Sequence, residues 1–584
     1  MSSVPASQQR QTVKWLCRLI FVLTAVVQLT RIVQVQSTTG EVPFHSANDR
    51  SRWCTIAALA VTGSYEIDDV IEIRDPDTRR RTWYTIDLVR HRGADGKQHY
   101  YSSKPPLLPT IYTGVYVAIR AVTGATLMSD PFFVVPVMLV IVNLLPLLAW
   151  WWLMLRWWER QLPDEKLADE KLATERVAAE RVAAERVTGD WSIIVLCLFM
   201  AWGTYLTTFV NTLNNHLPAA LCVGLSLWCI DRIAVVGDRR WRWFIVCGLA
   251  TSFAAANELP ALSWVAAAGG ILVFVDLRRT LLAYLPALVP VAAAFFITNY
   301  AAHDRWIPAY AHRDVGEHLF DFAAEPQVPI DQLPVSTFVD QLHRHGIECS
   351  QDVTVSAARR PGIYEVWDAE NELRFALRGS VSTSSSSDST DSDLAVSGDS
   401  PNSHVIGVYE WGDWYDYPGS YWTSERKQGV DRGEPNQLKY AMHSLIGHHG
   451  IFSLTPFWFV ALWGVVIVWT QRQSWRLWRD RRLLVVAAIV ATSVVSIGFY
   501  LARPLEDRNY GGVSSGFRWA FWLTPLWLLP ALVGLRHVRS FATRRIVEGL
   551  LLASVFSACF AWTNPWVSPW LMQLWEHLGW TASL

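Results

Sequence analysis

The residues best suited to chemistry lie in one polar segment near the N-terminus, residues 36–106. Asp49 stands at the start of an apolar-periodic run, where a carboxylate either caps a helix or acts as a general base. The segment continues over 83–109 as a predicted hairpin and ends in Lys104 and two prolines. The prolines fix the backbone where the next apolar run begins, which holds the Lys104 ammonium at the height of a lipid phosphate. The spacing therefore predicts a base and an anion-binding group on one loop.

A second cationic group lies near the C-terminus, where Arg503, Arg508 and Arg518 crowd one short polar segment. A guanidinium fork matches the oxygens of a phosphate, so an arginine here is a candidate phosphate ligand. Pairing with Glu506 and Asp507 explains Arg503 and Arg508 equally well. Arg518 is left as the strongest candidate.

Two more polar residues, His216 and Glu258, follow separate apolar runs. If those runs bundle, both side chains can face the site of Asp49. Capping and solvation of helix ends is the plainer explanation for either residue alone.

Tyr417 and Trp422 belong to an aromatic stretch, 409–422, that also carries carboxylates. Aromatic faces beside acids suit sugar stacking, and an interfacial aromatic belt is an equal alternative. No motif specifies a metal or another cofactor, because the adjacent His448 and His449 cannot share one helix face. A divalent cation therefore stays an open alternative.

Long apolar runs must position these residues. Of the 584 residues, 51% are hydrophobic and only 18% are charged, and 32 are tryptophan. A single soluble core stops growing at roughly 250–300 residues. The composition instead predicts an α-helical polytopic membrane protein with about eleven transmembrane helices and a mixed α/β loop domain. The expected spans are residues 15–35, 131–155, 191–210, 217–236, 243–257, 260–276, 281–299, 451–470, 483–503, 519–535 and 546–562.

The distribution of lysine and arginine in the short loops predicts the orientation. Arg-rich loops follow the even-numbered spans, and Arg10 and Lys14 precede the first, so the N-terminus is expected in the cytoplasm. Counting 107–127 as a span would invert this pattern, so it is expected to be an interfacial or re-entrant helix. The C-terminus and residues 300–450 then lie outside, with membrane lipid around the spans (the inner membrane in a bacterium). The net charge of −1 excludes a nucleic-acid partner judged on bulk charge.

Three parts are expected along the chain. They are an N-terminal membrane module (1–299) with an outer loop (36–130) and a cytoplasmic insert (156–190), an extracytoplasmic α/β domain (300–450), and a C-terminal membrane module (451–584). The insert holds five tandem pentapeptides and is interpreted as a solvated loop expansion. Within the α/β domain, the alternation over 362–379 predicts a hairpin, and the Ser-rich stretch 380–403 is expected to be a disordered tether.

An acidic residue that opens a helix after the first span, followed by a turn and the sequence KPPL at 104–107, resembles the membrane glycosyltransferases of the GT-C superfamily. The protein O-mannosyltransferases and the lipid A aminoarabinose transferases are the most similar in pattern. Residues 49–53 read DRSRW where the family has Asp-Glu-Thr-Arg-Tyr, so Asp49 takes the position of the catalytic base and Arg50 replaces the glutamate. YGG at 510–512 and the GFR that ends at Arg518 are similar to a YGG…GxR pattern of such transferases.

The resemblance implies transfer of a sugar from a polyprenyl-phosphate donor to an unidentified acceptor at the outer face of the membrane. Asp49 would deprotonate the acceptor, and Lys104 and Arg518 would stabilise the departing phosphate. Two alternatives stay open. A transporter or flippase of a lipid-linked or polar solute would predict internal repeats and paired broken helices. A catalytically degenerate envelope scaffold would explain Arg50.

Overall fold

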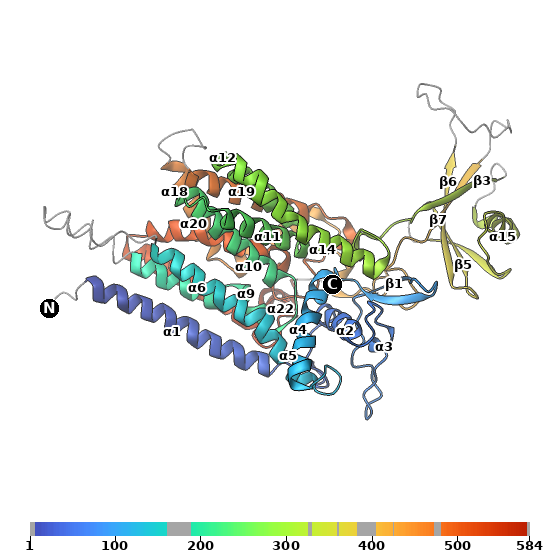
Figure 1. Ribbon diagram of the computed structural model, residues 1–584, viewed down its shortest axis with the longest axis horizontal. Helices are drawn as coiled ribbons and strands as arrows, with labels where there is room; N and C mark the ends of the chain where they lie inside the picture. The colour runs from blue at the N-terminus through green and yellow to red at the C-terminus, as the bar shows by residue number, and fades with distance from the viewer. Residues whose placement is uncertain are drawn as a thin grey trace, which may run out of the picture.

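The computed structural model describes residues 6–160, 189–324, 330–358, 361–381, 404–423, 425–471 and 481–580. Most of these residues form helices that run together in one bundle, and a small β-rich part projects from one end of it (Figure 1). The N-terminal end of α1 (Ala6–Val33) lies at the opposite end of the bundle. Helices α2 (Ala47–Val61) and α3 (Asp68–Ile71) lie at the same end as the β-rich part.

Seven helices in the described part of the chain are long and apolar enough to cross a membrane. They are Gln11–Val33, Pro131–Trp158, Gly189–Asn211, His216–Val235, Leu277–His303, Arg481–Leu501 and Arg518–Arg536. The larger expected number of about eleven is not reached by these criteria and stays a prediction.

Four expected spans form helices that are too short or too charged to count among these seven. Helices α11 (Trp241–Asn257), α12 (Leu262–Val275) and α18 (Trp458–Thr470) are shorter than a full span, with 17, 14 and 13 residues. Helix α21 (Phe541–Phe560) has 20 residues but carries three charged side chains in its first two turns. Segment 107–127 forms α4 (Leu107–Thr123), which is also short and apolar.

The remaining helical elements divide or connect these helices. They are α5 (Pro131–Leu139), α6 (Leu145–Arg160), α9 (Tyr205–Thr208), α10 (His216–Ile230), α13 (Leu277–Arg279), α14 (Leu285–His303), α16 (Gln437–Leu445), α17 (Ile451–Leu454), α19 (Arg481–Leu501), α20 (Thr524–Arg536) and α22 (Trp570–His577).

A buried arginine in the first candidate span stabilises an irregular stretch of the third candidate span. The helix that ends at Asn211 passes through π and 3₁₀ turns, which leave backbone carbonyls without helical partners. Arg31 donates to the carbonyls of Thr207 and Thr208 at 2.8 and 3.0 Å, and to the carbonyl of Trp562 at 2.7 Å. A charged side chain within a span needs such partners, and here they fix the loop that leads to α10.

The predicted helix start and hairpin of the first polar segment are confirmed. Helix α2 begins after Ser46, whose hydroxyl accepts from the backbone N–H of Asp49 at 3.1 Å, so the N-cap is Ser46 rather than Asp49. Strands β1 (Leu88–Arg92) and β2 (Gln98–Ser102) pair in antiparallel order around a tight turn.

The β-rich part is a five-stranded antiparallel sheet in the order β3-β7-β6-β5-β4. Its strands are β3 (His318–Ala324), β4 (Val353–Ala357), β5 (Ile363–Asp368), β6 (Leu373–Val381) and β7 (His404–Glu410). The hairpin expected over 362–379 is confirmed as β5 and β6. Helix α15 (Val335–Arg344) packs its apolar residues against the sheet.

Two expected low-complexity features lie outside the described residues. The pentapeptide repeats fall within 161–188, and the Ser-rich stretch is described only where it begins at the end of β6.

Candidate anion-binding cavity

A large cavity lies where the first polar segment meets the ends of several long helices. Its volume is about 520 Å³, within the range of small-molecule sites. The start of α2, the segment after β2, the end of α11, the end of α19 and the loop 503–519 all line it. Elements far apart in sequence therefore form one site.

Two of the cavity's cations come from the first polar segment. Arg52 is buried and donates to the side-chain oxygen of Asn215 at 2.7 Å and to the carbonyl of Asn48 at 2.9 Å. Lys104 Nζ lies 3.1 Å from Asp87 Oδ2. Burial lowers the pKa of Arg52 to about 10 and that of Lys104 to about 8. Both side chains are thus cations at neutral pH.

The third cation, Arg518, is held by a strained loop. Tyr510, Gly511 and Gly512 all have positive φ, at 58°, 92° and 76°. The Tyr510 ring stacks on His449 with 4.6 Å between centroids, which anchors the one non-glycine residue of this turn. The Gly511 carbonyl accepts from Arg518 Nε, and the guanidinium lies 4.8 Å from the centroid of the Trp566 ring. The loop therefore aims the remaining guanidinium nitrogens at the cavity.

His216 and Glu258 meet in the cavity wall. His216 Nδ1 contacts the Glu258 carboxylate, and His216 Nε2 lies 3.5 Å from Arg518 Nη1. Glu258 also accepts from Asn215 Nδ2 at 2.7 Å and from the Tyr500 hydroxyl at 3.2 Å. Both oxygens of Glu258 are therefore engaged inside the protein.

Charges around the cavity nearly balance. Six lysine and arginine side chains and five aspartate and glutamate side chains line it, which leaves one positive charge. They are Arg52, Lys104, Arg313, Lys427, Arg503 and Arg518, with Asp87, Glu258, Asp431, Glu506 and Asp507. One excess positive charge suits a singly charged anion such as a phosphodiester.

One wall of the cavity is apolar. Leu259 and Pro260 line it at the start of the helix that becomes α12, and Phe499 and Trp519 line it from α19 and the following loop. Helices α12 and α19 are in contact, and Leu259 and Phe499 are 46% and 40% exposed. The cavity is thus bordered by apolar surface between two helices.

Asp49 does not line this cavity. Its Oδ1 accepts from Trp53 Nε1 and from the backbone N–H of Leu213, both at 2.9 Å, and its Oδ2 accepts from the backbone N–H of His45 at 3.1 Å. The carboxylate is buried, and burial raises its pKa to about 6 although the hydrogen bonds oppose this. The structure thus makes Asp49 a tie between α2 and the 212–213 loop.

Some of the other predicted site residues line the cavity and some do not. The structure brings Lys104, Arg518, His216, Glu258 and Trp422 to the cavity. Two candidates lie elsewhere. Arg508 donates to the carbonyls of Arg503 and Pro435 at 2.9 and 3.1 Å, and Tyr417 packs edge-on against Tyr100 at 5.5 Å between centroids.

Sequence reasoning missed the acidic residues Asp87 and Asp431. Asp87 lies one residue before β1 in the predicted hairpin, so an acid next to a strand end was the available signal. Asp431 lies in a 3₁₀ turn, Gly429–Arg432, and no motif marks it.

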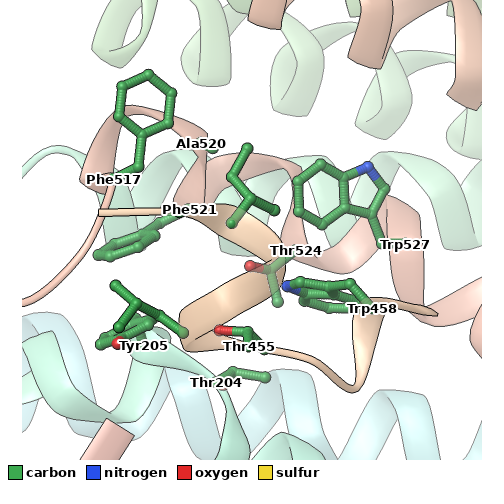
Figure 2. Close-up of a pocket in the computed structure, with 12 residues that line it drawn as sticks. Thr204, Tyr205, Thr455, Trp458, Phe517, Ala520, Phe521, Thr524 and Trp527 are labelled. Carbon is green, nitrogen blue, oxygen red and sulfur yellow. The ribbon is translucent and has the colours of Figure 1, made fainter. Parts of the chain in front are cut away.

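A smaller pocket is lined in part by Phe517, Ala520 and Phe521, which flank Arg518 and Trp519 in the sequence, and it has no charged lining residue (Figure 2). Tyr205 and Phe521 stack there with 4.8 Å between centroids, and Phe521 also packs edge-on against His216 at 6.4 Å. This aromatic pocket supports the cavity wall rather than forming a polar site. Among the described residues, no group of three or more His, Cys, Asp or Glu side chains could hold a metal ion.

Comparison of the chain with known proteins gives no match to a family model, to a curated protein or to a solved structure.

Proposed function

We propose that the protein is a membrane glycosyltransferase of the GT-C type, which moves a sugar from a polyprenyl-phosphate carrier to an acceptor. The observation that carries this proposal is the meeting of Arg52, Lys104 and Arg518 in one cavity with an apolar wall. A phosphate that joins a sugar to a lipid needs cations, a polar space and an apolar path, and this cavity supplies all three.

We infer the orientation of the donor from the lining of the cavity. Its phosphate lies among the three cations, its isoprenoid tail follows the apolar wall between α12 and α19, and its sugar fills the polar volume. Trp422 lines that volume, with its Nε1 donating to the carbonyl of Ile86 at 2.8 Å, so its ring is fixed as a stacking face.

The proposed reaction is an in-line displacement with inversion at the anomeric carbon. The acceptor oxygen or nitrogen attacks, and the phosphate leaves with the bonding electron pair. Arg518 and Lys104 stabilise the charge that develops on the departing phosphate. In this scheme Asp49 positions α2, because three N–H groups already occupy its carboxylate.

The proposed side of the membrane follows from the loop charges. The start of α2 lines the cavity, and α2 and the five-stranded sheet lie at the end of the bundle away from the N-terminal end of α1 (Figure 1). With the N-terminus in the cytoplasm, the cavity, the 300–450 region and the C-terminus face outward.

The test uses purified protein, a polyprenyl-phosphate-linked radiolabelled hexose and a panel of protein, lipid and glycan acceptors. We expect turnover by the wild-type protein and a loss of at least about 100-fold in Arg518→Gln. Arg426→Gln is the matched control, because Arg426 is exposed and donates to the Gly419 carbonyl at 2.9 Å. Donor flux across liposomes without transfer would instead favour a transporter, and binding without turnover would favour a scaffold.

A further inference from the structure

The cavity has one carboxylate that suits proton transfer. Both oxygens of Glu258 are engaged inside the protein, and Asp49 faces away. Asp87 is the counter-ion of Lys104, at 3.1 Å, on the side where the phosphate would bind. Asp507 pairs with Arg503 at 2.5 Å, and Glu506 is exposed. Asp431 remains, and it lines the cavity from the turn Gly429–Arg432.

The geometry around Asp431 leaves one oxygen available. Its Oδ2 accepts from the Tyr421 hydroxyl at 2.9 Å, and its Oδ1 has only a long contact of 3.4 Å with Asn509 Nδ2. The Cβ position of Gly512 would be 3.5 Å from Oδ1 and 3.8 Å from Arg518 Nη2. Gly512 therefore lies close to both the carboxylate and the guanidinium.

We propose that Asp431 is the general base that takes the proton from the acceptor in the proposed transfer reaction. The inference rests on the proposed function. The acceptor proton passes to Asp431 Oδ1 as the acceptor bonds to the anomeric carbon and the carbon–phosphate oxygen bond breaks. The lipid phosphate leaves with the electron pair beside Arg518, and the proton on Asp431 then passes to water.

The charges that face Asp431 suit this role. Burial raises its pKa above the ordinary range, and the negative charge of Asp87 raises it further. The Tyr421 hydrogen bond and the positive charges of Arg518 and Lys427 oppose these effects. A raised pKa makes a carboxylate a stronger base, and catalytic bases are tuned in this direction.

The experiment measures turnover, donor binding and the pH profile of kcat/KM on the full-length protein. Asp431→Asn is expected to lose about 10²–10⁴-fold in turnover and to keep the donor Kd within a factor of two to three. Asp340→Asn, an exposed acid on α15, is the matched control with unchanged turnover.

Two further variants test titration of Asp431 itself. Tyr421→Phe removes a hydrogen bond that favours the ionised carboxylate, so the acidic limb of the profile should move to higher pH. Asp87→Asn removes a negative charge, so the same limb should move to lower pH. A merely structural Asp431 would give no opposite shifts.

The outcomes separate the two proposals. Asp431→Asn with turnover near that of the wild type, or a limb that neither variant moves, overturns Asp431 as the base while the transferase proposal stands. Absence of turnover by the wild-type protein with every donor and acceptor overturns both.

Discussion

Replacing Lys104 with arginine separates the charge of this side chain from its titration. Lys104 is 20% exposed and lies 3.1 Å from Asp87. Burial lowers its pKa to about 8, with further lowering by Arg52 and Arg518 and an opposing effect of Asp87. The ammonium is therefore charged below pH 8 and loses its charge as the pH rises through that value.

The size of the effect follows from this pKa. The phosphodiester of the donor keeps one negative charge from pH 7 to 9, so only the protein titrates. If binding needs the charged ammonium, the donor Kd rises about twofold at pH 8 and about tenfold at pH 9. An arginine stays charged throughout, so Lys104→Arg should bind donor equally well from pH 7 to 9. Lys104→Met should lose a charge-assisted hydrogen bond worth about 1.5–3 kcal/mol, or roughly 10–150-fold in Kd.

The assay is equilibrium binding of the radiolabelled donor to detergent-solubilised protein at pH 7, 8 and 9 and constant ionic strength. Asp87→Asn serves as the internal control, because loss of its negative charge should move the midpoint of the Lys104 titration below pH 8. A wild-type Kd that stays constant to pH 9, or Lys104→Met binding as tightly as wild type, would refute the phosphate-binding role of Lys104.

Two more predictions concern residues outside the cavity. Asp49→Asn should retain turnover within about tenfold of wild type. Asp49→Ala should lower the thermal midpoint, because three buried N–H groups lose an acceptor worth about 1–3 kcal/mol each. Loss of all turnover in a normally folded Asp49→Asn would restore Asp49 as the base. Burial between Tyr101 and Trp414 lowers the pKa of His91 to about 4, so the folded state takes up this proton only at lower pH than the unfolded chain does. Stability should therefore fall as the pH drops from 6.5 to 4, by about 3 kcal/mol from His91, and His91→Phe should remove that part of the decline in thermal midpoints between pH 7 and 4.5.

The sequence located α2 but not the direction of its side chains. Successive residues of a helix are about 100° apart, so neighbours face different surroundings. Asn48 and Arg52, four residues apart, face the cavity, whereas Asp49 accepts from Trp53 and from the backbone of Leu213. A resemblance based on residue identity predicts that a helix begins near Asp49. It does not predict which side of the helix faces the cavity, because tertiary packing sets that orientation.

The predicted cations were easier to find than the acids. Lys104 and Arg518 stood out because an arginine or lysine beside an expected outer face is unusual. Asp431 gave no such signal, since its relation to Asp87 depends on segments more than 300 positions apart meeting in the fold. The count of about eleven spans stays a prediction for a related reason, because the apolar runs over α11, α12 and α18 predict helices without setting their full length.

The charge balance of the cavity links donor binding to base strength. Without a donor, the three cations proposed to bind its phosphate offset the field of Asp87 and Glu258, and Arg518 lowers the pKa of Asp431. A bound phosphate neutralises part of that positive field, so the proton affinity of Asp431 rises once the donor is in place. A base that strengthens when the leaving group is bound takes its proton in the complex that can react. This coupling would act over a short distance, because the Cβ position of Gly512 would be 3.5 Å from Asp431 Oδ1 and 3.8 Å from Arg518 Nη2.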